Sequence, residues 1–275
     1  ASQGRIFNTL GFQQLSLVEV WKSVNTDPSN YSAHRLVADS YSALPRHQIA
    51  RVSELLQSQM LQPLNLSPIQ PQMAESNLRI LEGSGPSSPS FNEYNPLLVR
   101  NSVAFQADGV VGGKNTWGND AAVSAIWNRF SLSMGQFYYE TDGFRPNNDQ
   151  TKSIYDVFAQ AMLTHATSLQ AEYRYKDDKY GDLPLRFDPN NFIFDYRYHD
   201  QPASARLGLK HSFAPGSDLL ISLSYQQAYY DLFTSTSSIK MDQDGYMGEA
   251  QYLYRSNVFS LIGGGGAVDL SGDTN

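Results

Sequence analysis

Residues 168–176 read Ser-Leu-Gln-Ala-Glu-Tyr-Arg-Tyr-Lys. From Leu169 onward, the odd-numbered positions hold leucine, alanine or tyrosine, and the even-numbered positions hold glutamine, glutamate, arginine or lysine. Successive side chains of a β-strand point to opposite faces of the sheet. The stretch therefore predicts a strand with one apolar face and one charged face.

The same two-residue period recurs along the second half of the chain. It is present in residues 130–134, 203–210, 218–226 and 246–255. We count about nine strands of this kind between residue 97 and the glycine run Gly263–Gly266, which we interpret as a loop or a strand end. The sequence therefore predicts an antiparallel sheet within the segment 97–275.

The charged side of these strands limits what each face can contact. A lysine or arginine that faces lipid from a barrel strand costs about 2 to 4 kcal/mol at the centre of the membrane. The charged rows are therefore expected to point into the lumen of a barrel, and their mixed signs predict a hydrated interior with modest selectivity. The residues expected to line the lumen are Arg100, Asp108, Asp156, Glu172, Arg174, Lys176, Arg206, Lys210, Glu249 and Arg255.

Short turns and long polar loops are expected to alternate along the sheet. Tight turns are predicted near residues 127–129, 166–167, 214–217 and 256–257, and long loops at 112–120, 140–151, 177–201 and 231–243. This alternation is typical of an outer-membrane β-barrel with periplasmic turns and extracellular loops.

Aromatic residues gather near the predicted strand ends, where a barrel carries its interfacial girdles. The loop-side group is Phe137, Tyr138, Tyr139, Tyr229 and Tyr230, and the turn-side group is Trp127, Phe130 and Tyr254. The alternative is a soluble sheet in which these residues form cross-strand packing pairs under a second layer.

The strand number predicts that the barrel is incomplete. Bacterial single-chain barrels have an even number of strands, and an open sheet edge is not tolerated in hydrocarbon. With about nine strands counted, we expect further strands to be missing and Asn275 to mark a truncation within an extracellular loop.

The first 96 residues have a different pattern. Residues 1–61 show apolar residues at helical spacing, interrupted near Pro28 and again near Pro45, which predicts a segment of three short helices. Residues 62–96 contain six of the 13 prolines of the chain and are predicted to be a linker, with a short helix at about 74–81.

The segment from Asp27 to Tyr41 resembles a junction between tetratricopeptide repeats. Such a junction has an Asp-Pro-x-Asn turn, here residues 27–30, followed by a helix that carries alanine and leucine at fixed positions, here Ala33, Leu36 and Ala38. Pro45 departs from the repeat, which would continue its helix there. The resemblance implies a terminal capping unit, with more repeats before Ala1 because repeats bury their faces only by stacking.

The order of the parts resembles bacterial outer-membrane proteins in which periplasmic tetratricopeptide repeats precede a C-terminal barrel, such as the exopolysaccharide-export porins for cellulose and poly-N-acetylglucosamine. The resemblance implies an outer-membrane location with a periplasmic N-terminal segment. It implies a conduit or anchor for export, with outer-membrane lipid, a periplasmic protein and a polysaccharide cargo as partners.

Composition excludes several other classes. The 275 residues carry 20 Lys+Arg against 27 Asp+Glu, a net charge of −7, and contain no basic block of the kind that binds nucleic acid. The absence of cysteine excludes disulfides and thiolate metal sites. Only 17% of residues are charged, while 14 are Phe and 17 are Tyr, as a lipid-facing β surface requires.

No sequence motif of catalysis or cofactor binding is present, so we expect neither an enzyme nor a cofactor nor a metal site. Aspartates at 242 and 244, and at 177, 178 and 182, have oxygen ligands suited to calcium but lack the twelve-residue calcium loop. Two other functions are left open. One is a soluble carbohydrate-binding β domain, and the other is a barrel hydrolase that uses Ser222 or Ser224 with His211.

Overall fold

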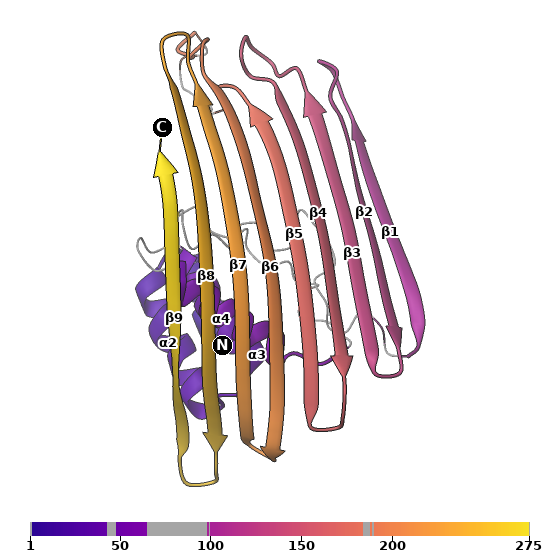
Figure 1. Ribbon diagram of the computed structural model, residues 1–275, viewed down its shortest axis with the longest axis vertical. Helices are drawn as coiled ribbons and strands as arrows, with labels where there is room; N and C mark the ends of the chain where they lie inside the picture. The colour runs from indigo at the N-terminus through magenta and orange to yellow at the C-terminus, as the bar shows by residue number, and fades with distance from the viewer. Residues whose placement is uncertain are drawn as a thin grey trace.

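The computed structural model describes residues 2–42, 48–64, 98, 100–183, 188 and 190–274. In these residues four helices precede nine strands (Figure 1). The helices are α1 Ser2–Thr9, α2 Gln13–Thr26, α3 Tyr31–Ser42 and α4 Gln48–Leu61. The strands are β1 Ser102–Val111, β2 Trp117–Trp127, β3 Phe130–Thr141, β4 Gln150–Met162, β5 Thr167–Tyr180, β6 Arg197–Ala214, β7 Ser217–Phe233, β8 Ser238–Arg255 and β9 Ser260–Thr274.

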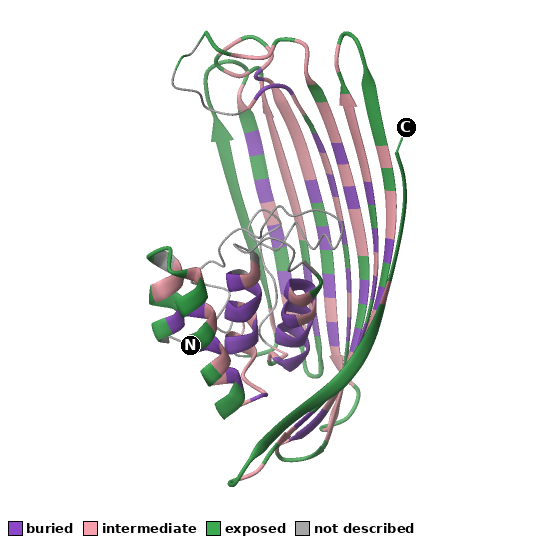
Figure 2. Cartoon of the chain, turned by 90° about the vertical axis from the view of Figure 1, so that its left-hand side faces the viewer, coloured by how far each residue is buried: buried purple, intermediate pink, exposed green. Residues whose placement is uncertain are grey.

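The nine strands form one antiparallel sheet in chain order, from β1 at one edge to β9 at the other. The sheet curves into an open trough, and the helices lie on its concave side (Figure 2). The predicted fold class, helices followed by an incomplete antiparallel barrel, is confirmed. The glycine run Gly263–Gly266 lies inside β9, so its interpretation as a loop was wrong. These glycines pair with β8 through backbone hydrogen bonds, which need no side chain.

The loop prediction was correct at some connections and wrong at one. Asn128 and Gly216 adopt positive φ angles of 54° and 77° in the tight turns between β2 and β3 and between β6 and β7. The predicted loop 231–243 is instead mostly strand, because β7 extends to Phe233 and β8 begins at Ser238. The convex positions of these extensions include Asp231, Lys240 and Asp242, so this face resembles a loop in composition although the ladder continues.

The helical segment contains one more helix than predicted. Gly11, at a φ of 83°, separates α1 from α2, where the sequence predicted a single helix. The turn between α2 and α3 is held by Asp27, which accepts hydrogen bonds from the backbone and hydroxyl of Ser29 at 3.1 and 2.7 Å. Asn30 caps α3 by accepting from the Ala33 N–H at 3.1 Å.

The predicted linker 62–96 and its short helix at about 74–81 lie almost entirely outside the described residues, which stop at 64 and resume at 98. The break near Pro45 also lies outside them. Among the described residues, no helix has the length and apolar character needed to cross a membrane.

Helix α4 packs directly against the concave face of the sheet. Its Leu55, Leu56 and Met60 form one buried apolar cluster that includes Leu220 of β7 and Leu253 of β8. The sequence did not predict this contact, because the alternation in β7 and β8 placed only a polar surface there. Helix α4 and the sheet therefore share one core, and a second apolar cluster lies between α2 and α3.

Gly208 of β6 marks the closest approach of α4 to the sheet. A Cβ atom at this position would lie 2.9 Å from Cγ of Gln170 and 3.0 Å from Cγ of Met60. Real Cβ atoms are not found that close to other atoms, so a side chain at Gly208 must displace one of these neighbours.

We therefore expect Gly208→Val to loosen α4 from the sheet at a cost of about 1 to 3 kcal/mol. Amide hydrogen exchange of residues 55–61 should accelerate by about tenfold or more. Gly265→Ala is the matched control, because a Cβ at Gly265 meets nothing within 4 Å. Unchanged exchange in the Gly208 variant would contradict this packing.

Candidate functional site

The concave face of the sheet carries a buried network of opposite charges. Glu172 of β5 lies between two guanidinium groups: Nη2 of Arg174 at 2.8 Å from its Oε1, and Nη2 of Arg206, which bonds Oε2. The side chains of all three are at most 4% exposed. Nε2 of Gln59, from α4, donates to Oε2 of Glu172 at 3.3 Å. The helix thus completes the hydrogen bonding of a carboxylate in the sheet.

The last turn of α4 makes further polar contacts with the sheet. With its amide nitrogen facing the helix, Gln170 donates to the Gln59 carbonyl at 3.2 Å and accepts from the Met60 N–H at 3.3 Å. Nearer the first turn, Oγ of Ser53 donates to Oε1 of Glu249 at 2.9 Å. The bond to the Gln59 carbonyl satisfies a backbone acceptor at the helix end that has no partner within the helix.

The register places nine of the ten residues expected to line a lumen on the concave face. These nine are Asp108, Asp156, Glu172, Arg174, Lys176, Arg206, Lys210, Glu249 and Arg255. Arg100 lies in a bend before β1 and is exposed.

Several of the nine form ion pairs beyond the Glu172 network. Lys176 lies 2.8 Å from Asp200, and Arg255 lies 2.8 Å from Asp27 of the helical segment. Asp156 is 2% exposed and pairs in register with Arg174.

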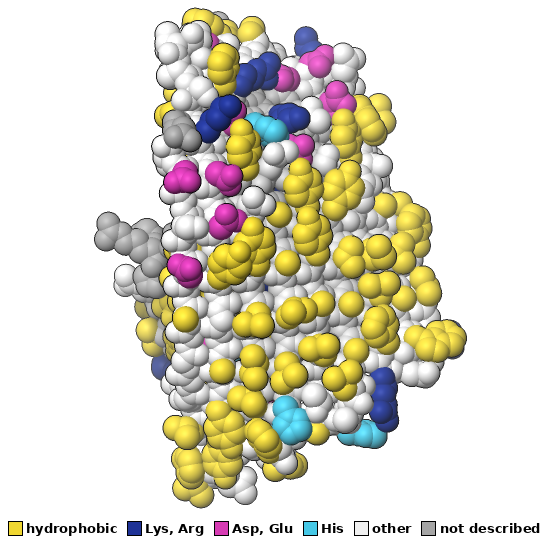
Figure 3. All heavy atoms as spheres, in the orientation of Figure 1, with side chains coloured by type: hydrophobic (Ala, Val, Ile, Leu, Met, Phe, Trp, Pro, Cys, Tyr) yellow, Lys and Arg dark blue, Asp and Glu magenta, His cyan; other side chains and the backbone are white. Residues whose placement is uncertain are grey.

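The convex face is apolar and uncovered in the part of the chain that the structure describes. Leu207, Leu223, Tyr173 and Tyr246 are 53%, 56%, 51% and 57% exposed. Figure 3 shows apolar side chains spread across the strands. A second layer over this face, as the soluble-sheet alternative requires, is therefore excluded for the described residues.

The apolar band crosses the strands obliquely (Figure 3). One row of partners runs from Trp127 on β2 to Ala250 on β8. On β2 the apolar band lies to one side of this row and reaches Trp117, with one interruption at Asn119. On β8 the band extends equally to both sides of the row and ends before Asp244. Its centre therefore shifts by about five residues, or about 17 Å, over six strand spacings of about 4.8 Å. The resulting slope of about 30° is close to the tilt of barrel strands.

The predicted aromatic groups divide between the two faces. Trp127, Phe130 and Tyr254 lie on the convex face at the turn end, and Tyr138 and Tyr229 lie on it toward the loops. The other three loop-side residues, Phe137, Tyr139 and Tyr230, lie on the concave face according to the strand register. Their interpretation as girdle residues was therefore wrong. Adjacent residues of a strand cannot share a face.

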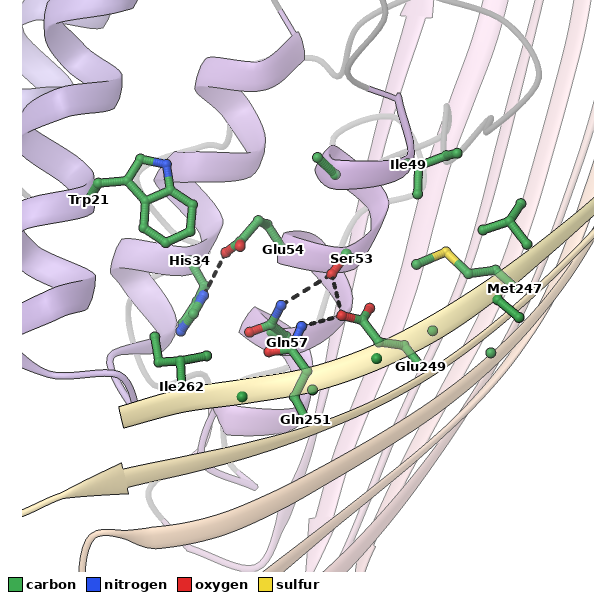
Figure 4. A pocket seen from close by; sticks show the side chains of 18 residues that line it. Trp21, His34, Ile49, Ser53, Glu54, Gln57, Met247, Glu249, Gln251 and Ile262 are labelled. Carbon is green, nitrogen blue, oxygen red and sulfur yellow. Dashed lines mark hydrogen bonds and ion pairs between the residues drawn. The ribbon is translucent and has the colours of Figure 1, made fainter. Parts of the chain in front are cut away.

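His34 of α3 is buried between two oxygen atoms (Figure 4). Its Nδ1 lies 2.6 Å from Oε2 of Glu54 on α4, and its Nε2 lies 2.8 Å from the Pro28 carbonyl. Burial by itself lowers the pKa of His34, but the hydrogen bond to Glu54 and the attraction of that carboxylate outweigh it, with a further contribution from Pro28. The pKa of His34 is therefore raised above its ordinary value, and its hydrogen bond to Glu54 holds α3 against α4.

The serine–histidine pair considered for hydrolysis is not assembled. His211 pairs with Leu219 and faces the convex side, where Oγ1 of Thr167 lies 2.9 Å from its Nδ1. Ser222 and Ser224 are buried on the opposite face. The two kinds of group therefore cannot exchange a proton.

The aspartates considered for calcium have other partners. Asp178 lies 3.6 Å from Lys152, Asp182 lies 3.4 Å from Arg145, and Asp244 accepts a hydrogen bond from Tyr225 at 2.6 Å. In the described part of the chain, no group of three or more histidine, aspartate or glutamate side chains is arranged to hold a metal ion.

The fold is similar to that of an outer-membrane receptor. The solved structure of the FpvAI–pyocin S2 complex matches with a TM-score of 0.50 and 13% identity, over 63% of this chain and 29% of that one. The ferripyoverdine receptor of the outer membrane of Pseudomonas aeruginosa, bound to ferripyoverdine, matches with a TM-score of 0.50 and 12% identity, over 62% of this chain and 28% of that one. The chain thus spans less than a third of either receptor chain, and at this identity the likeness shows the fold alone. No protein-family model and no curated protein matches the sequence.

We expect Glu172→Gln to destabilise the protein strongly, because it removes the buried carboxylate to which the guanidinium groups of Arg174 and Arg206 both bond. Removing one partner of a buried ion pair costs about 3 to 5 kcal/mol. Asp177→Asn is the control, since Asp177 pairs with His199 at 2.8 Å on the convex side with 29% of its side chain exposed. A surface pair contributes about 1 kcal/mol or less. Denaturant unfolding in detergent would give the free energy of unfolding of both variants. Equal losses in the two variants would refute the buried network.

The His34–Glu54 pair predicts that the helical segment weakens with rising pH. Because the folded pKa of His34 lies above its ordinary 6.5, the stabilisation is complete below 6.5 and is lost as the pH rises through the raised value. Amide exchange of α3, corrected for its intrinsic pH dependence, should accelerate in a comparison of about pH 6 with about pH 9. His34→Gln should abolish this change. A wild-type α3 that is equally protected at both pH values would contradict the prediction.

Proposed function

We propose that the nine strands form part of the wall of an outer-membrane β-barrel that serves as a transport conduit. The observation that carries the proposal is the oblique apolar band on the uncovered convex face, opposite a concave face of buried charges. Lipid cannot hydrogen-bond to these charges, whereas a hydrated lumen can. The likeness in fold to a receptor of the outer membrane supports the same location.

The height of the band also suits a membrane. On β7 the convex face is apolar or aromatic from Leu219 to Tyr229, apart from Gln227. Ten residue steps of about 3.3 Å, on a strand tilted by about 40°, rise about 25 Å along the barrel axis. This is the height of the apolar band on transmembrane barrels.

Helices α3 and α4 would lie inside this conduit rather than outside it. They occupy the concave side near the short turns, which the proposal places at the periplasmic end (Figures 1 and 2). Because α4 is bonded to β5 and β8 through Gln59 and Ser53, transport through this part of the lumen requires the helix to move or the cargo to pass beside it. We therefore assign the helices the role of a partial occlusion.

The resemblance to exopolysaccharide-export porins supports a polysaccharide as the cargo. The concave face carries serine, glutamine and oppositely charged side chains, a chemistry that suits sugar hydroxyls and has no large charge of one sign. The serines and glutamines include Ser131, Ser133, Gln160, Ser222 and Gln226, which are buried, so a sugar would reach them only after a rearrangement. The N-terminal helices, which resemble a repeat cap, would dock a periplasmic partner. No catalytic role is proposed.

Spin labels on neighbouring residues of β7 test which face meets lipid. The chain contains no cysteine, so Leu223→Cys and Ser222→Cys each provide a single labelling site. In native outer-membrane vesicles, the label at Leu223 should be relaxed strongly by oxygen and weakly by a water-soluble nickel chelate, because it lies in hydrocarbon. The label at Ser222 should show low accessibility to oxygen. Equal relaxation of the Leu223 label by the nickel chelate would exclude contact with lipid.

A further inference from the structure

A cavity of about 670 Å³ lies between the helices and the last two strands (Figure 4). Its helical side includes Trp21 of α2, the His34–Glu54 pair and Ser53 of α4. Its sheet side is formed by β8, with Glu249, and by β9. The cavity is thus enclosed by elements from both ends of the chain.

The glycine run in β9 creates the space. Gly264 and Gly266 face the concave side, next to Gln251 and Glu249 of β8. A Cβ at Gly264 would lie 2.5 Å from the Ala250 carbonyl oxygen, and one at Gly266 would lie 2.8 Å from the Gly248 carbonyl oxygen. The floor of the cavity is therefore bare backbone, pressed closely against β8.

Among the described residues, the lining carries one more carboxylate than it has cationic partners. Glu249 accepts hydrogen bonds from the Ser53 hydroxyl at 2.9 Å and from the Gln251 amide, and both donors are neutral. The Glu54 carboxylate is matched by His34. No lysine or arginine of the described residues lines the cavity. One carboxylate therefore faces the space without a positive partner there.

We propose that this cavity binds an organic cation, with an ammonium group at Glu249. The indole of Trp21, on the helical side, offers an aromatic face to a positive charge, and such contacts contribute about 0.5 to 2 kcal/mol. Ile49, Met247 and Ile262 supply apolar contacts for an alkyl chain between charged ends. A bare metal ion would find a single free carboxylate there, because no group of three or more histidine, aspartate or glutamate side chains of the described residues is arranged to hold a metal ion.

Spermidine is a suitable probe because its ammonium groups are separated by short alkyl chains. Isothermal titration of the full chain in detergent should give saturable binding at one site. Glu249→Gln keeps the shape of the side chain and should weaken binding about tenfold or more, the effect of losing about 1.4 kcal/mol. Trp21→Leu should weaken it by a smaller factor.

Three comparisons make the result decisive. Asp242→Asn removes an exposed carboxylate on the convex side of β8 and should leave binding unchanged. Magnesium chloride and sodium chloride at equal ionic strength should compete equally and weakly. Equal affinity of the wild type and Glu249→Gln, or displacement by magnesium well beyond that by sodium, would overturn the proposal. Circular dichroism of each variant separates loss of the site from loss of the fold.

Discussion

The fold depends on keeping most charges off the apolar convex face while giving partners to the charges that are buried on the concave face. The two-residue period of the strands separates the charges onto the concave face, and burial there would be costly without compensation. Glu172, Arg174 and Arg206 compensate one another, and Gln59 of α4 supplies a further hydrogen bond. The same constraint explains why a helix lies in the trough: it covers the Leu220 and Leu253 side chains that interrupt the polar surface.

Local periodicity was enough to predict the sheet and the face on which each charge lies. The stretch 168–176 contains this information by itself, because a strand offers only two faces and one of them cannot carry Arg174. The same reasoning failed to predict the loop-side ends of β7 and β8, where the convex positions are polar. Beyond the apolar band, Asp231 and Lys240 remain in paired strands although their composition is that of a loop. Hydrogen bonding between backbones determines these ends, and sequence composition does not report it.

The contact between helix and sheet could not be predicted from either partner. The apolar residues of α4 predict a buried face but not its partner, and a repeat-like turn at Asp27 suggested stacking on other helices. Two residues of the sheet marked this contact, but neither could be interpreted from the sequence alone. Gly208 interrupts a strand where a close approach requires no side chain, and Leu220 is a large apolar residue on an otherwise polar face. Each of these residues is explained only by the contact between α4 and the sheet.

Binding of a ligand in the cavity beside α4 would depend on the position of the helices. A ligand held between Glu249 of β8 and Trp21 of α2 contacts both the wall and the helical segment, so it would bind the seated arrangement more tightly than one in which the helices have moved away. The hydrogen bond from Ser53 to Glu249 already joins the same two elements. A ligand shifts an equilibrium only through its different affinities for the two states. A cation at Glu249 would therefore favour the state in which the helices occlude the lumen, whereas a cargo that competes for Glu249 would favour release of the helices.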